Sequence, residues 1–525
     1  MLCGLSALLV MLSGSFSALA APTSTTSPAS ASGASWTVYH GDPEGSGVAT
    51  SVSSVDLSSR AWTSPALDGE LYTQPLVFEG NVYVATENDT VYALSATTGA
   101  VVWSTHVATP VPSQSLPCGD ISPTVGITGT PVIDPSRSEI FAVADELVNG
   151  SPAHTLVGLD TETGKIELTQ AVDPAGATPA NLLQRTGLTL DEGHVVFGMG
   201  GNYGDCASYR GRVISVPETG GTASVFTVDA AASDNQGAIW MGGAAPVVDS
   251  SGNVWVSAGN GSVYSASEPY DDSDSVLELS PSMTLVQYFA PSNWPANNAS
   301  DLDMSDAPAL LPDGQVVLAG KSRIVYLLNG SALGGIGGQE AALPAACSED
   351  IDGGVAIEGT TVFLPCFAGP IAVQVSTSPP ALQLLWRSPA GGGPPIVAGG
   401  LVWTIGQNGV LYGLNPTSGS VQQQATIGAP ANHFPTPSVG AGLLLATSAT
   451  HVVAFAAPSS SSAPSTTTTT TSPSTTTTAP RVTTTTAAAP SNRTTAAVVG
   501  IVVASLVVIA TVAWLVVRRR RSRRP

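Results

Sequence analysis

The sequence predicts an all-β fold, an eight-bladed β-propeller, followed by a single C-terminal membrane-spanning helix. The main observation is a repeated segment, clearest at residues 91–103, where Val-Tyr-Ala-Leu-Ser-Ala-Thr-Thr-Gly is followed by Ala-Val-Val-Trp. Related copies lie at 157–165, 213–220 and 411–421. Such internal repeats indicate an array of similar supersecondary units. Only 10% of residues are charged and the chain has 55 glycines and 40 prolines, which suits many short strands joined by turns.

Each repeat predicts four strands. The first has short β-rich segments at 75–77, 81–85, 90–94 and 101–103, rich in Val, Tyr and Leu. The Thr-Gly step at Gly99 supplies the left-handed residue that a short hairpin loop needs. Further units begin near Pro131, Gly187, Pro246, Pro308, Gly354 and Pro395.

An eighth unit begins at Pro437 and stops after Phe455, one strand short. The segment 59–62, ending in Trp62, resembles the strand that ends in Trp103. A strand from the N-terminus would complete the last blade and leave no unpaired edge. The predicted propeller therefore covers 36–457, with seven blades as the alternative because the unit around Gly187 is irregular.

Both ends of the chain carry targeting signals. Residues 1–20 read as a signal peptide, with small residues before the expected cleavage point. Residues 496–517 carry no charge and are long enough to cross a bilayer. The arginine-rich tail at 518–525 predicts a cytoplasmic C-terminus and an extracellular N-terminal domain on a single-pass membrane protein.

Two low-complexity segments flank the predicted propeller. Residues 21–35 form a Ser/Thr/Ala-rich linker, and residues 458–495 are almost wholly Thr, Ser, Pro and Ala. Neither can bury a core, so the second is expected to be an extended stalk. The arginine-heavy, Ala/Gly-rich composition is typical of a bacterium with a GC-rich genome.

The charge balance argues against nucleic-acid binding. The chain has 38 acidic and 17 basic residues, and six of the arginines lie in the tail. A nucleic-acid-binding domain needs a basic footprint.

The repeats resemble those of the quinoprotein, or PQQ-binding-like, β-propeller family. The resemblance rests on Trp36–Asp42, on Gly126–Asp134, and on the stretch from Ile239 through Gly261 to Asp303. Family members that are dehydrogenases hold PQQ and Ca²⁺ at the centre of the propeller, with an Asp as base.

This resemblance implies a set of site residues. Asn260 matches the amide that ligates calcium and Asp303 lies near the position of the base. Asp205 is one residue out of register with the carboxylate ligand. Trp240 is the nearest candidate for the tryptophan that stacks on the quinone, although Ala245 and Pro246 stand where that side chain is expected. The adjacent Cys-Cys pair and the Cys-x-x-Cys-His haem motif of related enzymes are absent from the sequence.

Four cysteines follow the signal peptide, and an even number predicts two disulfides in an oxidising compartment. Three pairings are possible, and Cys347 with Cys366, leaving Cys118 with Cys206, is the favoured one.

Other polar segments favour structural roles. The acidic loop 268–274 lacks the glycine and distal Glu of an EF-hand and reads as a solvated turn, and Asp301, Asp303 and Asp306 read the same way. His40 and Asp42 read as part of the closing segment. The tryptophans at 62, 103 and 386 are expected to pack between blades.

The sequence therefore favours a cell-surface binding or scaffold module for an extracellular protein or glycan, with no cofactor. The alternative is a PQQ- and Ca²⁺-dependent dehydrogenase of alcohols or sugars, with Asn260 and Asp205 on Ca²⁺ and Asp303 as base. A purely structural envelope protein is the third possibility.

Overall fold

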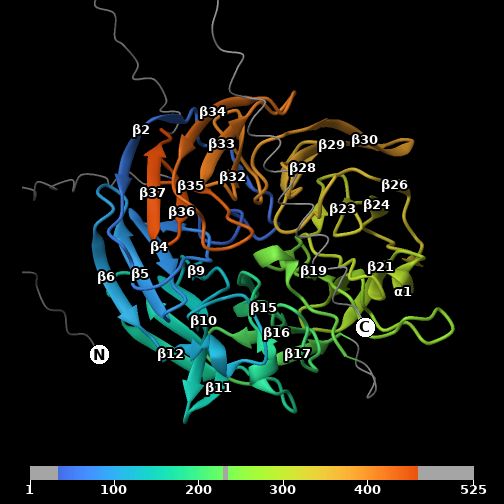
Figure 1. Cartoon of the computed structure of the whole chain (residues 1–525), viewed down its shortest axis with the longest axis horizontal. Coiled ribbons are helices and arrows are strands. Elements are labelled where there is room, and N and C mark those ends of the chain that lie inside the picture. The colour runs from blue at the N-terminus through green and yellow to red at the C-terminus, as the bar shows by residue number, and fades with distance from the viewer. Residues whose placement is uncertain (1–33, 229–234, 459–525) are drawn as a thin grey trace, which may run out of the picture. The chain divides into compact units, whose positions relative to one another are not determined.

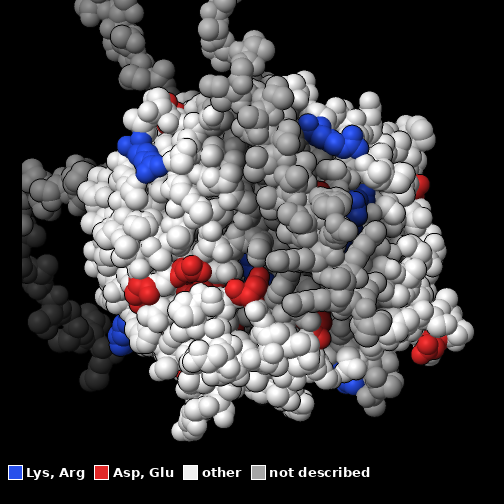
Figure 2. Space-filling model, viewed as in Figure 1, with Lys and Arg blue, Asp and Glu red and all other residues white. Residues whose placement is uncertain are grey.

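The computed structural model describes residues 34–228 and 235–458, and these residues form eight blades in a ring, each built on four antiparallel strands (Figure 1). The sheets follow one another around the ring in chain order. The prediction of an eight-bladed all-β propeller is confirmed. On the face in Figure 2, most of the described surface is uncharged, in keeping with the low content of charged residues.

In the first four blades the strands follow chain order from the inner to the outer strand. Blade one is β3 (Leu76–Phe78), β4 (Asn81–Ala85), β5 (Thr90–Ser95) and β6 (Val101–His106). Blade two is β9 (Val132–Asp134), β10 (Glu139–Val148), β11 (Ser151–Asp160) and β12 (Ile166–Ala171). Blade three is β14 (Thr189–Asp191), β15 (His194–Gly201), β16 (Arg212–Pro217) and β17 (Ser224–Thr227). Blade four is β18 (Val247–Val248), β19 (Val254–Ala258), β20 (Ser275–Leu279) and β21 (Leu285–Ala290).

Three of the other four blades repeat this order. Blade five is β22 (Ala309–Leu310), β23 (Gln315–Leu318), β24 (Val325–Asn329) and β26 (Ala341–Leu343). Blade six is β27 (Ala356–Glu358), β28 (Thr361–Leu364), β29 (Ile371–Thr377) and β30 (Pro380–Arg387). Blade seven is β31 (Ile396–Ala398), β32 (Leu401–Gly406), β33 (Val410–Leu414) and β34 (Val421–Thr426). Blade eight is β35 (Ser438–Gly440), β36 (Leu443–Ser448), β37 (His451–Ala456) and β2 (Asp56–Thr63).

Short elements decorate the blades. Their bounds are β1 (Val48–Ala49), β7 (Val111–Pro112), β8 (Thr124–Val125), β13 (Leu182–Leu183), β25 (Gly335–Ile336), α1 (Trp294–Asn298) and the 3₁₀ turns Ser113–Ser115, Pro179–Asn181 and Met241–Gly243. β13 and β14 both pair with β15, which explains why the unit around Gly187 looked irregular in the sequence.

The ring is closed by the N-terminal strand, as predicted. β2 pairs antiparallel with β37, with Arg60 opposite Phe455 and Trp62 opposite Ala454. The last blade thus takes its outer strand from the start of the domain, and the ring is closed by a sheet rather than by a loop.

The three repeat tryptophans pack between blades, as predicted. Each indole nitrogen donates to a carbonyl in the turn of the following blade: Trp62 to Ala96 at 2.8 Å, Trp103 to Thr161 at 2.9 Å and Trp386 to Pro416 at 2.8 Å. The turn glycines have φ near +70°, and a Cβ on any of them would meet the indole within 2.5 Å: Gly99, Gly164 and Gly419. The glycine of the Thr-Gly or Ser-Gly step therefore both forms the hairpin turn and leaves space for the indole of the neighbouring blade.

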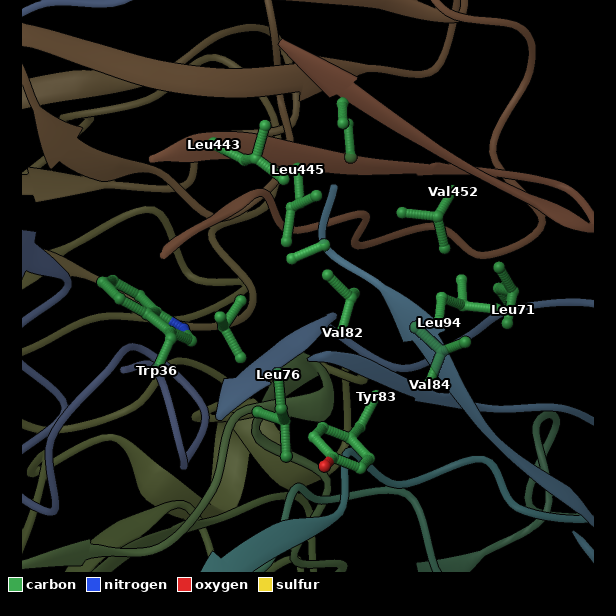
Figure 3. Close-up of a cluster of buried hydrophobic side chains, with 14 of the residues drawn as sticks. Trp36, Leu71, Leu76, Val82, Tyr83, Val84, Leu94, Leu443, Leu445 and Val452 are labelled. Carbon is green, nitrogen blue, oxygen red and sulfur yellow. The ribbon is translucent and has the colours of Figure 1, made fainter. Parts of the chain in front are cut away.

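The core lies between adjacent blades. Figure 3 shows the cluster shared by blades one and eight, in which Val82 and Val84 of β4 lie with Leu445 of β36 and Val452 of β37. Trp36 joins this cluster and donates Nε1 to Gln74 Oε1 at 3.1 Å. Inner strands are buried on both faces, which explains their continuous runs of Val, Leu and Ala.

Several predicted segments lie outside the described residues. They are the signal peptide (1–20), nearly all of the linker (21–35), the stalk (458–495) apart from its first residue, the membrane span (496–517) and the tail (518–525). In the part of the chain that the structure describes, no helix is long and apolar enough to span a bilayer.

Candidate functional site: a cavity at one end of the propeller axis

In each blade, the turn between the second and third strands and the connection to the next blade fall at the same end of the propeller, because the strands alternate in direction. These loops enclose a cavity of about 530 Å³. Its charged lining residues are Asp120, Arg185, Asp301, Lys321, Glu349, Asp350, Asp352 and His433, and its aromatic lining residues are Tyr72, Tyr203, Trp240, Phe367 and Phe434. Pockets of this size with aromatic walls and a few polar groups are typical small-molecule sites.

Two disulfides fasten the walls of this cavity. Cys118 is bonded to Cys206 and Cys347 to Cys366, so the favoured pairing is confirmed. The first joins the loop that carries Asp120 to the β15–β16 loop, and the second encloses the segment that carries Asp350 and Asp352. Disulfides form and persist in oxidising compartments, which fits an extracellular or periplasmic domain.

The structure brings Asn260 and Asp303 together. The backbone N–H of Asn260 donates to Asp303 Oδ1 at 2.7 Å, and its side-chain Nδ2 donates to Asp301 Oδ1 at 2.9 Å. The ammonium of Lys321 forms an ion pair with Asp303 Oδ2 and lies 3.4 Å from Asp301 Oδ1. Burial opposes the charge on Lys321, but Asp303 and Asp301 outweigh burial and raise its pKa.

Asp205 lies near this group without joining its hydrogen bonds. Its Oδ1 accepts the hydroxyl of Tyr209 at 2.6 Å. Burial raises the pKa of Asp205, and the negative charges of Asp303 and Asp301 raise it further. Trp240 lines the cavity and donates Nε1 to Gly201 O at 3.0 Å. The predicted residues thus share one region, and their catalytic, metal-binding and cofactor-binding roles stay predictions.

These side chains do not form a calcium site as they stand. Asn260 Oδ1 is buried without a hydrogen-bond partner, as an unused ligand would be. However, Asp303 is already paired with the cation of Lys321, and Asp205 is bonded to Tyr209. In residues 34–228 and 235–458, no group of three His, Cys, Asp or Glu side chains could hold a metal ion. PQQ is also poorly matched by charge, since a polycarboxylate would meet five acidic and three basic lining residues.

Sequence reasoning missed several residues of the cavity. Arg185, Lys321 and Phe434 come from different blades, and His433 bonds through Nε2 to Asp120 Oδ2 at 3.1 Å across 313 positions. No local motif joins such residues, because only ring closure brings them together. The one sequence signal that could have indicated Lys321 is the scarcity of lysine, since the chain has only two lysines.

The acidic loop 268–274 is exposed at Glu268 but buried at Asp271 and Asp274, so the prediction of a solvated turn was wrong for these two aspartates. Asp271 is 4% exposed and Asp274 is fully buried. Asp271 accepts hydrogen bonds from the side chain and backbone of Ser273 and from the backbone N–H of Val263. Asp303 and Asp306 are likewise buried, at 3% and 0%, while Asp301 is exposed.

His40 is hydrogen-bonded to the connection that leads into blade six. Its Nδ1 lies 2.7 Å from Val355 O, whereas Asp42 accepts the backbone N–H of Ser46 at 2.8 Å. Burial lowers the pKa of His40 to about 4, so the ring is neutral.

A second buried histidine lies outside the cavity, on β11. His154 Nε2 lies 2.5 Å from Asp145 Oδ1, and its Nδ1 lies 2.6 Å from Asp173 Oδ1. Burial would lower the pKa of His154, but the two carboxylates raise it to about 10. The imidazolium therefore neutralises charge between blade two and the connection to blade three.

Comparison with known proteins assigns the repeat type. Residues 48–270 match the family described as outer membrane protein assembly factor BamB. The resemblance of the repeats to the PQQ-like β-propeller family is confirmed for this part of the chain. No curated protein matches the sequence.

Solved PQQ-like propellers share this fold. Quinohemoprotein alcohol dehydrogenase from Comamonas testosteroni superposes with a TM-score of 0.58 at 14% identity, covering 82% of each chain. A europium-containing methanol dehydrogenase gives 0.58 at 13% identity, covering 80% of this chain and 90% of its own. BamB from Moraxella catarrhalis gives 0.52 at 14% identity, covering 76% of this chain and 99% of its own. At these identities the similarity establishes the fold, which serves enzymes and an assembly factor alike.

Proposed function

We propose that this PQQ-like β-propeller is a binding module, anchored to the cell membrane by its C-terminal segment, that engages an extracellular protein or glycan. Its binding site is the axial cavity. The observation that carries the proposal is the composition of the cavity walls, in which aromatic side chains alternate with charged ones on loops tied by two disulfides. Aromatic faces bury large apolar area, and fixed polar groups orient a ligand.

The rigidity of the walls supports binding. Loops usually cost conformational entropy when they order around a ligand. Here the two disulfides hold the wall loops before any ligand arrives, and each loop leaves a blade that is packed on both sides. The wall loops of such a preformed cavity lose little conformational entropy when a ligand binds.

The test uses the purified full-length protein and saturation-transfer NMR with oligosaccharides and short peptides. We expect transfer to at least one of these ligands, and loss of the transfer in Phe367→Ala, because Phe367 is 40% exposed in the cavity wall. The matched control is Val102→Ala, a 52% exposed residue of β6 on the outer rim, which should bind as the parent does. Transfer that survives Phe367→Ala would place binding elsewhere.

A PQQ- and Ca²⁺-dependent dehydrogenase is the second candidate function. It is favoured by one observation, the buried and unpartnered Oδ1 of Asn260 beside Asp303. Incubation with PQQ and Ca²⁺, followed by a thermal shift assay and dye reduction with alcohols and aldoses, tests it. A shift that Asn260→Ala abolishes would favour the enzyme, and no shift at saturating cofactor would end this candidate.

A further inference from the structure

The axial cavity has two chemically different halves. One half is formed by connections that lead into blades one, two, three and eight, and it contains Arg185 together with the paired side chains of Asp120 and His433. The other half is formed by loops of blades four, five and six, and it contains Glu349, Asp350 and Asp352.

Arg185 presents a guanidinium that forms no direct ion pair among the described residues, although the charges of Glu87 and Asp120 favour its protonated form. Its Cζ lies 5.9 Å from the ring centre of Tyr72 and 6.0 Å from that of Phe434. Among the described residues, no carboxylate forms an ion pair with it and no acceptor forms a hydrogen bond with it. Arginine offers five donors in a planar fork that suits a carboxylate.

The backbone makes room for this guanidinium. Gly243 has φ +88°, and a Cβ at this position would lie 2.2 Å from Arg185 Nη1. The positive φ favours glycine at position 243, and a side chain there would have to displace the guanidinium. Burial lowers the pKa of Arg185, and a ligand carboxylate would restore the interactions that the guanidinium lost with water.

The opposite wall has carboxylates in excess. Lys321 is committed to Asp303 and Asp301. In the described chain no ion pair involves Glu349, Asp350 or Asp352. Asp352 is 8% exposed, and buried carboxylates of this kind favour a cation that can hydrogen-bond to them.

We propose that the axial cavity binds a short peptide as a zwitterion, with its carboxylate on Arg185 and its ammonium on the wall of Asp350 and Asp352. This inference rests on the proposed binding function of the same cavity and specifies the class of ligand. A free ammonium and a free carboxylate on one ligand satisfy both halves at once, whereas a neutral sugar satisfies neither charge and a polycarboxylate meets repulsion on the acidic wall.

The size of the cavity limits the peptide. A volume of 530 Å³ corresponds to a cube with an edge of about 8 Å, and an extended chain advances about 3.3–3.6 Å per residue. Two or three residues therefore span from one charged wall to the other. Trp240 and Phe367 lie in the wall to receive an apolar side chain.

The experiment is calorimetric titration of the full-length protein with Ala-Phe-Ala and three derivatives, namely the N-acetylated peptide, the C-terminal amide and the doubly blocked peptide. We expect Ala-Phe-Ala to bind, and each single block to weaken binding about tenfold, because each removes one charge-assisted contact. This pattern is read on the unsubstituted protein and depends on no variant.

Two variants assign each charge to its wall. Arg185→Gln should bind the free peptide and its C-terminal amide equally, and Asp350→Asn with Asp352→Asn should bind the free and N-acetylated peptides equally. Matched controls are Arg60→Gln on the exposed closing strand and Asp313→Asn in an exposed turn, both of which should keep full discrimination.

The outcomes separate this inference from the binding function. Equal binding of all four peptides, or no binding of Ala-Phe-Ala, overturns the inference. If maltotriose then binds in a manner that depends on Phe367, the cavity is still a binding site and only the ligand class is wrong. If neither Ala-Phe-Ala nor maltotriose binds, the proposed binding function of the cavity is refuted as well.

Discussion

Truncating Trp62 tests how the ring is closed. The side chain is 8% exposed, lies on Gly99 of blade one and donates to Ala96 O at 2.8 Å. Replacing a buried tryptophan by alanine costs about 3–5 kcal/mol. With about 2.1 cal/mol/K of unfolding entropy per residue, a domain of about 420 residues has about 0.9 kcal/mol/K, so the Tm should fall by about 3–6 °C.

Differential scanning calorimetry of the full-length protein measures this change. Trp62→Phe retains most of the packing and loses only the indole hydrogen bond, so its cost should be about 1 kcal/mol and its Tm should fall by about 1 °C. Val102→Ala, on the exposed outer rim, is the control and should melt with the parent. If Trp62→Ala melts within about 1 °C of the parent, the contact between Trp62 and Gly99 does not hold the ring closed.

Three further predictions concern buried charge, pH and the disulfides. His154→Gln should destabilise the protein by about 3–5 kcal/mol near neutral pH because it leaves a buried carboxylate without its cation. The pKa of His154 is about 10 in the folded protein and 6.5 in the unfolded chain, so the difference in unfolding free energy between parent and variant should narrow as pH rises from 6.5 to 10. A difference that stays constant with pH in urea unfolding would contradict this. Burial raises the pKa of Asp352 to about 6, so calorimetry should show that Ala-Phe-Ala binding weakens as pH falls below 6, and binding that is equal at pH 5 and 7.5 would count against Asp352 as its partner. Removing the Cys347–Cys366 bond, which spans 19 positions, should cost about 3 kcal/mol in urea unfolding and weaken peptide binding, whereas unchanged binding would show that the acidic wall holds its shape alone.

The fold could be predicted from the sequence because each repeat carries its own strand and turn signals. Each Thr-Gly turn, such as the one at Gly99, requires a left-handed residue, and the strands on either side carry β-branched and aromatic residues. The strand ending in Trp62 could be paired with the last blade because its pattern matched the strand ending in Trp103. The turn interpretation uses only residues near one another in the chain, and the closing strand was found by comparing one repeat with another.

The site was less predictable for a physical reason. Asn260 and Asp303 were found through a family resemblance, and the structure joins them by a 2.7 Å hydrogen bond. Arg185 lies in no segment that resembles a known family motif. The two rings that it contacts, Tyr72 and Phe434, come from opposite ends of the domain sequence. The burial of Asp274 was missed for a similar reason, because an acidic loop looks exposed until the chain that covers it is known.

The repeats alone were enough to predict a closed ring of eight four-stranded blades with a strand borrowed from the N-terminus, since strand and turn signals lie within each repeat and recur along the chain. Which side chains meet at the axis depends on the folded ring. There it pairs Lys321 with Asp303, leaves Arg185 without a direct ion pair among the described residues and collects carboxylates without ion pairs on the facing wall. Charge balance in a cavity depends on distances between blades, and those distances exist only once the ring is closed.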